Sequence, residues 1–307
     1  MRLFPIFLAA VAAHSIDASA AAPAAPDSQQ PNFKYLSDAA DGLFQLDGRS
    51  GCQPSRPCSW QVQSNVFDDR ILMFVVPVPG FGVGREEAAE RFVKAFGSTA
   101  APFRRTPIRV GISADGQHGF TFGFAETTRE NEPPLLQKYV AYWINRSTGW
   151  RIALLKILPR SEGEVSITAL QPSVPDPSTW EHVPRKDPQG SRKALETRER
   201  EFSNAAQTIG LGPAFARYGS ADAVNSGGER EFVLGNAAVG DLHGTGPSPL
   251  NWSADGGVIV SSSGDLGVTW GALRRNGPTP PGRMEKIPFF TVWRRASPNS
   301  PWLYVAE

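Results

Sequence analysis

Six side chains of the sequence could exchange protons with a substrate. They are three carboxyl groups, two imidazoles and a phenol: Asp69, Asp222, Asp265, His118, His243 and Tyr218. An imidazole titrates near neutral pH, and carboxyl groups serve as general acids or bases, so the set could support acid–base catalysis. A structural role competes in each case, because carboxylates bond backbone amides in turns and the two histidines adjoin glycines in turn-like segments.

Four large aromatic side chains could line a pocket for a small apolar ligand: Tyr218, Trp252, Trp270 and Trp293. Small-molecule sites are mostly apolar and hold a few polar groups, which this combination of residues would supply. Packing in a hydrophobic core is the alternative for each ring.

Other chemistries lack their residues. No Gly-x-Ser-x-Gly turn occurs, and Cys52 and Cys58 have no histidine beside them in the sequence, so neither a serine nor a cysteine nucleophile is expected. In an exported protein these two cysteines predict a disulfide. No histidines have metal-ligand spacing, and the glycines of 80–84 match no nucleotide-binding motif, so we expect neither a metal nor a cofactor.

Composition bounds the protein class. The 307 residues are 40% hydrophobic, and 31 basic against 30 acidic side chains leave a net charge of +1. This length suits two compact domains. The balanced charge disfavours nucleic acid and anionic membrane surfaces as partners.

The first 20 residues resemble a secretory signal peptide. Met1 and Arg2 precede an apolar run over 3–13, and Ala18-Ser19-Ala20 offers a cleavage site. The run of about 11 residues is shorter than the roughly 20 that span a bilayer. We therefore expect a periplasmic or secreted protein, not inserted in the membrane after cleavage, with 21–32 as a disordered spacer.

Hydrophobic periodicity divides the remaining chain into two similar halves joined by a Pro-rich linker, 172–191. The first half, 33–171, is expected to contain helices at 33–47 and 86–96 and strands at 71–78, 108–113, 118–126, 137–145 and 150–158. The run 60–67 fits either a helix or a strand. The second half, 192–307, is expected to contain helices over 195–209 and 213–218, a third helix starting at 235–239, and strands at 231–234, 258–262, 265–273, 288–294 and 302–306.

The two halves share a repeat. The pattern glycine, apolar, Thr, aromatic, glycine occurs at 119–123 and again at 267–271. Similar spacing relates Trp143 to Trp293, Trp150 to Trp302 and Gly84 to Gly235, which predicts one α+β fold used twice. Asp69 and Asp222 are expected to match in the same way. The strands 137–145 and 288–294 are apolar on both faces, so one face should pack on helices and the other on the sister domain or a second chain.

The second half resembles the nuclear-transport-factor-2-like superfamily, which includes ketosteroid isomerase and the SnoaL-like polyketide cyclases. The resemblance rests on the charged first helix and on the segments 218–224, 235–238, 263–267 and 290–295, with a more divergent copy in the first half. It implies two cone-shaped domains, each a curved antiparallel sheet wrapped on helices with a pocket at the wide end.

The resemblance does not bring a mechanism with it. The isomerase branch uses a carboxylate base and a protonated acid. The corresponding positions lie near 225–227 and Phe289 in the second half, and near Phe74 and Tyr139 in the first, and none is a carboxyl group. The sequence therefore predicts an exported tandem protein that binds a small hydrophobic ligand or serves as an interaction scaffold, with its halves paired within the chain or as a homodimer.

The alternative is an isomerase, cyclase or lyase acting on a hydrophobic molecule. It would use Asp222 or Asp265 together with His243 or Tyr218 as its acid and base.

Overall fold

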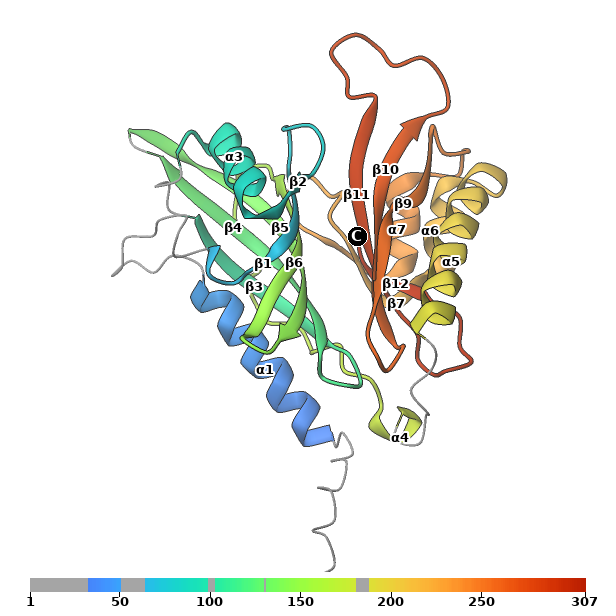
Figure 1. The fold of residues 1–307 in the computed structure, drawn as a ribbon. Helices are drawn as coiled ribbons and strands as arrows, with labels where there is room; N and C mark the ends of the chain where they lie inside the picture. Colours follow the sequence, from blue (N-terminus) through green and yellow to red (C-terminus); the bar gives the residue numbers. More distant parts are fainter. Residues whose placement is uncertain (1–32, 51–63, 99–102, 130, 181–187) are drawn as a thin grey trace, which may run out of the picture. The chain divides into compact units, whose positions relative to one another are not determined.

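The computed structural model describes residues 33–50, 64–98, 103–129, 131–180 and 188–307 (Figure 1). The signal peptide, the spacer and the disulfide between Cys52 and Cys58 that the sequence predicts lie outside these residues. No helix in the described part of the chain is long and apolar enough to span a membrane.

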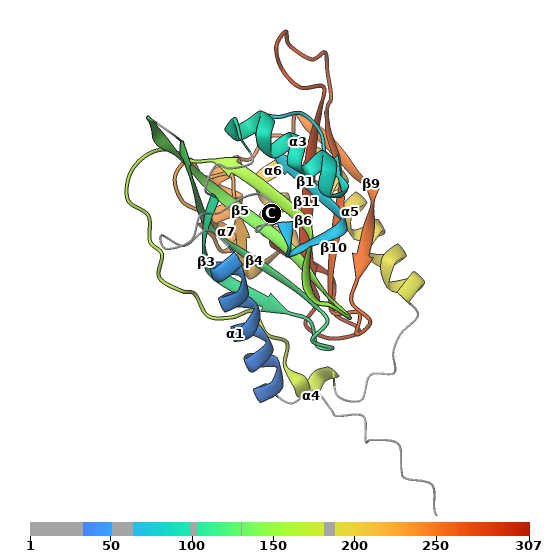
Figure 2. The ribbon, with the colours of Figure 1, turned by 60° about the vertical axis from the view of Figure 1, so that its left-hand side comes forward.

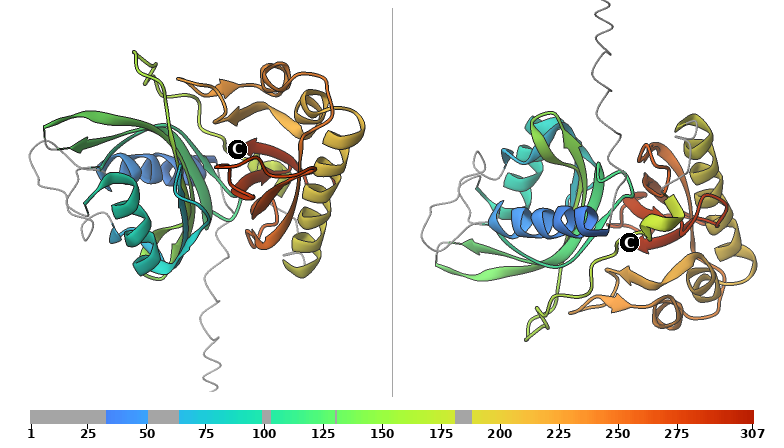
Figure 3. Two further views of the ribbon diagram at one scale, coloured as in Figure 1. Left: turned by 90° about the horizontal axis from the view of Figure 1, so that it is seen from above. Right: turned by 90° about the horizontal axis from the view of Figure 1, so that it is seen from below.

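The first half is a six-stranded sheet with two helices on one face (Figures 1 and 3). The strand order is β2-β1-β6-β5-β4-β3. The elements are α1 (Phe33–Ser50), β1 (Phe67–Val75), β2 (Gly82–Val83), α3 (Gly84–Phe96), β3 (Phe103–Ile112), β4 (His118–Arg129), β5 (Glu132–Arg146) and β6 (Gly149–Pro159). A short helix, α4 (Pro177–Trp180), follows within the segment that the sequence predicts as a linker.

The second half repeats this arrangement with the strand order β8-β7-β12-β11-β10-β9. Its elements are α5 (Pro188–Thr208), α6 (Leu211–Tyr218), β7 (Gly219–Asn225), β8 (Val233–Leu234), α7 (Asn236–His243), β9 (Leu250–Val260), β10 (Leu266–Arg275), β11 (Lys286–Arg294) and β12 (Leu303–Ala306). Strand for strand, the two sheets have the same topology, which confirms the predicted tandem α+β fold.

The strand register confirms the predicted repeat in detail. Gly119 lies opposite Trp143 on the neighbouring strand, as Gly267 lies opposite Trp293. Gly84 begins α3 and Gly235 immediately precedes α7, with positive φ angles of 81° and 87°, a conformation that favours glycine. The same backbone geometry is therefore built at matching places.

The expected match between Asp69 and Asp222 is wrong by one residue. Leu72 pairs with Val83 and Val224 pairs with Leu234, the residues just before the matched glycines Gly84 and Gly235. The backbone carbonyl closest to where a Cβ would stand on Gly84 belongs to Asp69, whereas at Gly235 it belongs to Ala221. Asp69 therefore matches Ala221. A slip of one residue moves a side chain to the other face of a strand, so the two aspartates have different surroundings.

Each sheet buries two apolar faces. On β5, Tyr139, Ala141 and Trp143 join the core beneath α1 and α3. The alternate residues Val140, Tyr142 and Ile144 join a second cluster that also contains Phe290 and Val292 of β11. We call the region in which this shared cluster joins the two sheets the seam. Because side chains alternate along a strand, two-sided burial explains why these strands are apolar throughout.

Candidate functional site

The interior of the second half contains a buried carboxyl group, that of Glu199. Leu195, Phe202 and Ala206 form the inward stripe of α5, and Glu199 lies on the same stripe, with none of its surface exposed. The predicted stripe was correct for these three apolar residues but not for Ile209, which is 42% exposed because the helix ends before it.

Three donors surround the Glu199 carboxyl group. The hydroxyl of Thr269 lies 2.5 Å from Oε2, the indole nitrogen of Trp293 lies 3.1 Å from Oε2, and that of Trp252 lies 2.6 Å from Oε1. Burial raises the pKa of Glu199 to about 7, and these hydrogen bonds hold it from rising further. Near neutral pH, the group can therefore hold or release a proton.

The first half has a matching carboxyl group with different partners. Leu43 lies against Gly119 as Leu195 lies against Gly267, and Asp47 follows Leu43 by the same four residues that separate Glu199 from Leu195. Asp47 is fully buried.

The partners of Asp47 are a phenol and a guanidinium group. The hydroxyl of Tyr139 donates to Asp47 Oδ2 at 2.6 Å, and Arg105 Nε lies 2.9 Å from Oδ1. Burial and the adjacent Asp47 hold the pKa of Tyr139 well above its usual range. The first copy of the fold thus contains an ion pair, whereas the second contains a carboxyl group whose hydrogen-bond donors are uncharged.

Aromatic rings fill the space around Glu199. The ring of Phe202 is fully buried, and five other rings lie with their centroids 5.0 to 6.1 Å from it: Phe215, Trp252, Tyr218, Tyr304 and Trp293. Three of the four predicted pocket residues therefore meet here. The fourth, Trp270, lies on the other face of the sheet, packed against the seam and against Gly256 and Gly257.

Tyr218 and His243 lie at the edge of this aromatic group. Tyr218 stacks on Phe202, and the guanidinium carbon of Arg198 lies 4.0 Å from the centre of its ring. His243 stacks on Phe215 at 4.1 Å, and burial lowers its pKa. Both are thus engaged in ring packing, and the structure joins neither of them to Asp222 or Asp265.

Asp265 lies in the seam, where two equivalent turns meet. We call residues 113–118 and 261–266 the turn pair. In each turn the fourth residue, Gly116 or Gly264, has a positive φ angle and donates to the carbonyl of the first residue at 2.9 Å. The fully buried Asp265 carboxylate accepts from the backbone N–H of Ala114, 151 residues away, at 3.0 Å.

Asp115 makes the reciprocal contact. Its Oδ2 accepts from the hydroxyl of Ser262 at 2.7 Å and from the backbone N–H of Ser263 at 3.0 Å. Burial raises the pKa of Asp115, but hydrogen bonds from Ser113 and Ser262 outweigh it and leave the pKa below its usual value. In Asp265 burial dominates, and the pKa is raised.

Arginines complete the polar part of the seam. Arg294 donates to the carbonyls of Ile112 and Ser173 at 2.9 and 3.0 Å, and its Nη1 lies 3.7 Å from Asp265. Arg109 forms an ion pair with Asp222 at 2.5 Å, where the Asp222 side chain is 46% exposed. Asp265 and Asp222 therefore link the two halves, and every polar contact described for them is internal to the chain.

A buried lysine ties the halves together at a further point. Lys138 of β5 is 1% exposed, and its ammonium group donates to the carbonyls of Ser226, Gly228 and Glu231, at 2.7 Å in the case of Ser226. Burial, assisted by the charge of Arg160, lowers the pKa of Lys138 to about 8.

His118 belongs to the turn pair and is not the solvated side chain that its glycine neighbour suggests. Its Nδ1 lies 2.9 Å from the hydroxyl of Tyr142. Burial lowers the pKa of His118 to about 4, despite the opposing charge of Asp115. Asp69, by contrast, is 91% exposed and pairs with Arg85 at 3.2 Å on the edge of the first half.

We expect His118 to stay neutral from about pH 5.5 upwards, because burial of its ring disfavours the imidazolium form. The unfolded chain would protonate it at the ordinary value, so this histidine favours the folded state above about pH 6.5 and loses that contribution as the pH falls. A two-dimensional NMR titration, with His118→Gln to assign the signal, would show this. A midpoint near 6.5 would contradict it.

Sequence reasoning missed Asp47, Glu199 and Asp115. Asp47 and Glu199 had a readable signal, since each continues the apolar stripe of its helix, four residues after Leu43 or Leu195. A carboxyl group on the buried face of a helix needs partners. Asp115 had no such signal in the sequence, because an aspartate that bonds only within its own turn would occur in the same sequence pattern.

The described residues contain no group of three His, Cys, Asp or Glu side chains that could hold a metal ion.

Comparison with solved structures finds similarities that each cover part of this chain. No protein-family profile and no curated protein sequence matches the chain. A ketosteroid isomerase-like protein from Erwinia carotovora atroseptica is 14% identical, and the similarity covers 44% of this chain and 100% of that one with a TM-score of 0.30. A nuclear-transport-factor-2-like protein with a cystatin-like fold from Novosphingobium aromaticivorans is 13% identical, with 43% and 92% covered and a TM-score of 0.31.

A third such protein, of unknown function and from Pseudomonas putida, is 13% identical, with 44% and 94% covered and a TM-score of 0.33. Each similarity covers less than half of this chain, and the chain contains two sheets of one topology. The two sheets of one topology support the predicted tandem α+β fold.

Proposed function

We propose that this chain is an exported, non-catalytic interaction scaffold made of two joined copies of one fold. The observation that carries the proposal is the packed interior of the second half. Phe202 and its five ring neighbours belong to the core of the second half. Because these rings are in contact, a ligand would have to displace them before it could bind.

The state of the acid–base candidates supports the same proposal. Asp265 and Asp222 bond across the seam, whereas Tyr218 and His243 are engaged in ring stacking. A catalytic pair needs two groups within reach of one substrate atom. These four residues are divided between two regions of the molecule.

An acid–base enzyme remains the second candidate because of Glu199. Its pKa of about 7 suits a general acid or base near neutral pH. Catalysis would require the aromatic rings around it to open towards a substrate.

Binding of small aromatic compounds separates these functions. We expect the tryptophan fluorescence of the wild type to be unchanged by benzene or indole analogues, whereas Phe202→Ala, which creates an apolar cavity, should bind them. Phe202→Val provides a smaller cavity if the alanine variant does not fold.

Micromolar binding to the wild type would overturn the scaffold proposal in favour of a ligand-binding protein or an enzyme. Glu199→Gln then divides those two, since a binding protein should keep its ligand and an enzyme should lose turnover of it.

A further inference from the structure

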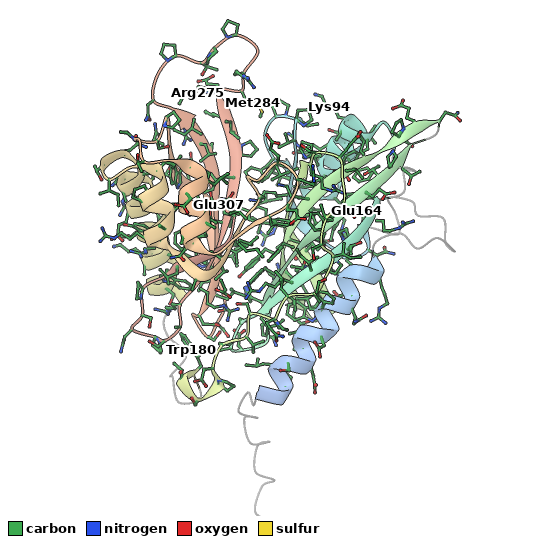
Figure 4. The ribbon with its side chains drawn as sticks, turned by 180° about the vertical axis from the view of Figure 1, so that it is seen from behind. Lys94, Glu164, Trp180, Arg275, Met284 and Glu307 are labelled. Atoms are coloured by element: carbon green, nitrogen blue, oxygen red, sulfur yellow. The ribbon has the colours of Figure 1, made fainter. Side chains whose placement is uncertain are left out.

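The loop between β10 and β11, residues 276–285, encloses a basic hollow. The loop extends beyond the ends of its strands (Figure 2), and Arg275 and Met284 lie where the strands pass into it (Figure 4). The hollow has a volume of about 730 Å³. Its charged lining consists of four cations and one carboxylate: Arg274, Arg275, Arg283, Lys286 and Glu285.

These cations are poorly neutralised by the protein. The whole chain has a net charge of only +1, so four cations around one hollow are a local concentration. Arg274 pairs with Asp255 and donates to the carbonyl of Ala272, which fixes its position. For Arg275, Arg283 and Lys286, no carboxylate of the described residues lies within ion-pair distance.

Arg275 provides an unmet donor. Its Nε bonds no acceptor of the described residues. Arg275 lines the hollow, so its guanidinium group can donate to a ligand there.

The paired cations of the basic hollow have no counterparts at the matching described positions of the first half. Gly123 pairs with Tyr139 in the first half as Gly271 pairs with Phe289 in the second. Three residues further along these strands, Glu126 lies opposite Leu136 in the first half. In the second half, Arg274 lies opposite Lys286. The next residue is Thr127 in the first half and Arg275 in the second. A shared fold therefore does not require these cations, which are a specific feature of this copy.

We propose that the hollow binds a small multivalent oxyanion, meaning a ligand with two or more phosphate or carboxylate groups. Its volume is that of a small-molecule site. Guanidinium groups bind such oxyanions through paired hydrogen bonds. Pro278, Pro280 and Pro281 in the wall restrict the loop, which lowers the entropy lost when a ligand orders it.

This inference goes beyond the scaffold function and does not depend on it, because the hollow lies outside the packed interior. Isothermal titration calorimetry of the full chain at low ionic strength tests it, with inorganic tripolyphosphate and citrate as probes. We expect one site per chain. The double variant Arg275→Gln/Arg283→Gln should weaken binding by about tenfold or more, as the loss of charged hydrogen bonds implies.

Two controls make the result specific. Arg192→Gln/Lys193→Gln removes the same charge from an exposed part of α5 and should leave the affinity within about twofold, whereas Glu285→Gln should strengthen binding. Tighter binding of tripolyphosphate or of citrate identifies phosphate or carboxylate as the preferred group.

Equal losses in both double variants, or no binding of either probe to the wild type, would overturn the proposal. The scaffold test uses uncharged aromatic probes, so the failure of one proposal is distinguishable from that of the other.

Discussion

Replacing Glu199 by glutamine is expected to remove a strong pH dependence of stability. Burial raises the pKa of Glu199 to about 7 from an ordinary value of 4.5. Between these values the folded state holds a proton that the unfolded state has released, so the free energy of unfolding falls as the pH rises and levels off above about 7. The difference in pKa corresponds to roughly 3 kcal/mol across this window.

The measurement is urea unfolding at several values between about pH 4.5 and 8. Subtracting the Glu199→Gln curve from that of the wild type cancels the contributions of groups that titrate independently of Glu199. The contribution of Glu307 remains in part, because the charge of Glu199 raises its pKa. Glu201→Gln is the matched control, since Glu201 lies on the same helix with half of its side chain exposed and a single ion pair to Arg198. If wild type and Glu199→Gln have parallel pH profiles, the carboxyl group is already ionised at low pH in the folded state.

Asp265→Ala is expected to destabilise the protein by about 3 kcal/mol at neutral pH. The substitution leaves the backbone N–H of Ala114 and the hydroxyl of Ser263 without their acceptor, and it leaves Arg294 without its nearest carboxylate. Buried donors and charges are costly when their partner is removed.

Asp222→Ala serves as the comparison in the same region. Asp222 also pairs with an arginine across the seam, but its side chain is 46% exposed, and exposed ion pairs contribute about 1 kcal/mol or less. Urea unfolding of the two variants at one pH measures both effects. Equal losses would show that the turn pair contributes no more than a surface contact.

Together these residues explain how the molecule uses its polar groups. The turn pair and Lys138 hold the two sheets against each other by hydrogen bonds that run in both directions across the seam. The aromatic interior keeps Glu199 away from water. The polar groups named here thus serve contacts within the double fold.

Short-range patterns allowed the tandem fold to be predicted. The glycines and tryptophans of β4, β5, β10 and β11 recur at nearly constant spacing because both copies need the same close contacts between helix and strand, as Leu43 on Gly119 and Leu195 on Gly267 show. The apolar stripes of α1 and α5 predicted their inward faces for a similar local reason. Such signals lie within one element or between neighbours, so they can be read from the chain.

The sequence alone could not determine which face of each strand points inward. Trp270 and Trp293 lie on adjacent strands that have apolar residues on both faces, yet Trp293 packs in the core of the second half and Trp270 packs against the seam. The one-residue error for Asp69 has the same origin. Alternating side chains define two faces of a strand, but they do not tell which face packs against which part of the protein.

The partners of the charged residues were decided only by the tertiary structure. Asp265 bonds to Ala114, which lies 151 residues away, and Glu199 gathers donors from three strands. Whether a carboxyl group is a catalyst, an ion-pair partner or a buried link depends on burial and on donors that folding brings together. The sequence by itself thus determined two copies of one α+β fold, and the packing of those copies decided what their acidic residues do.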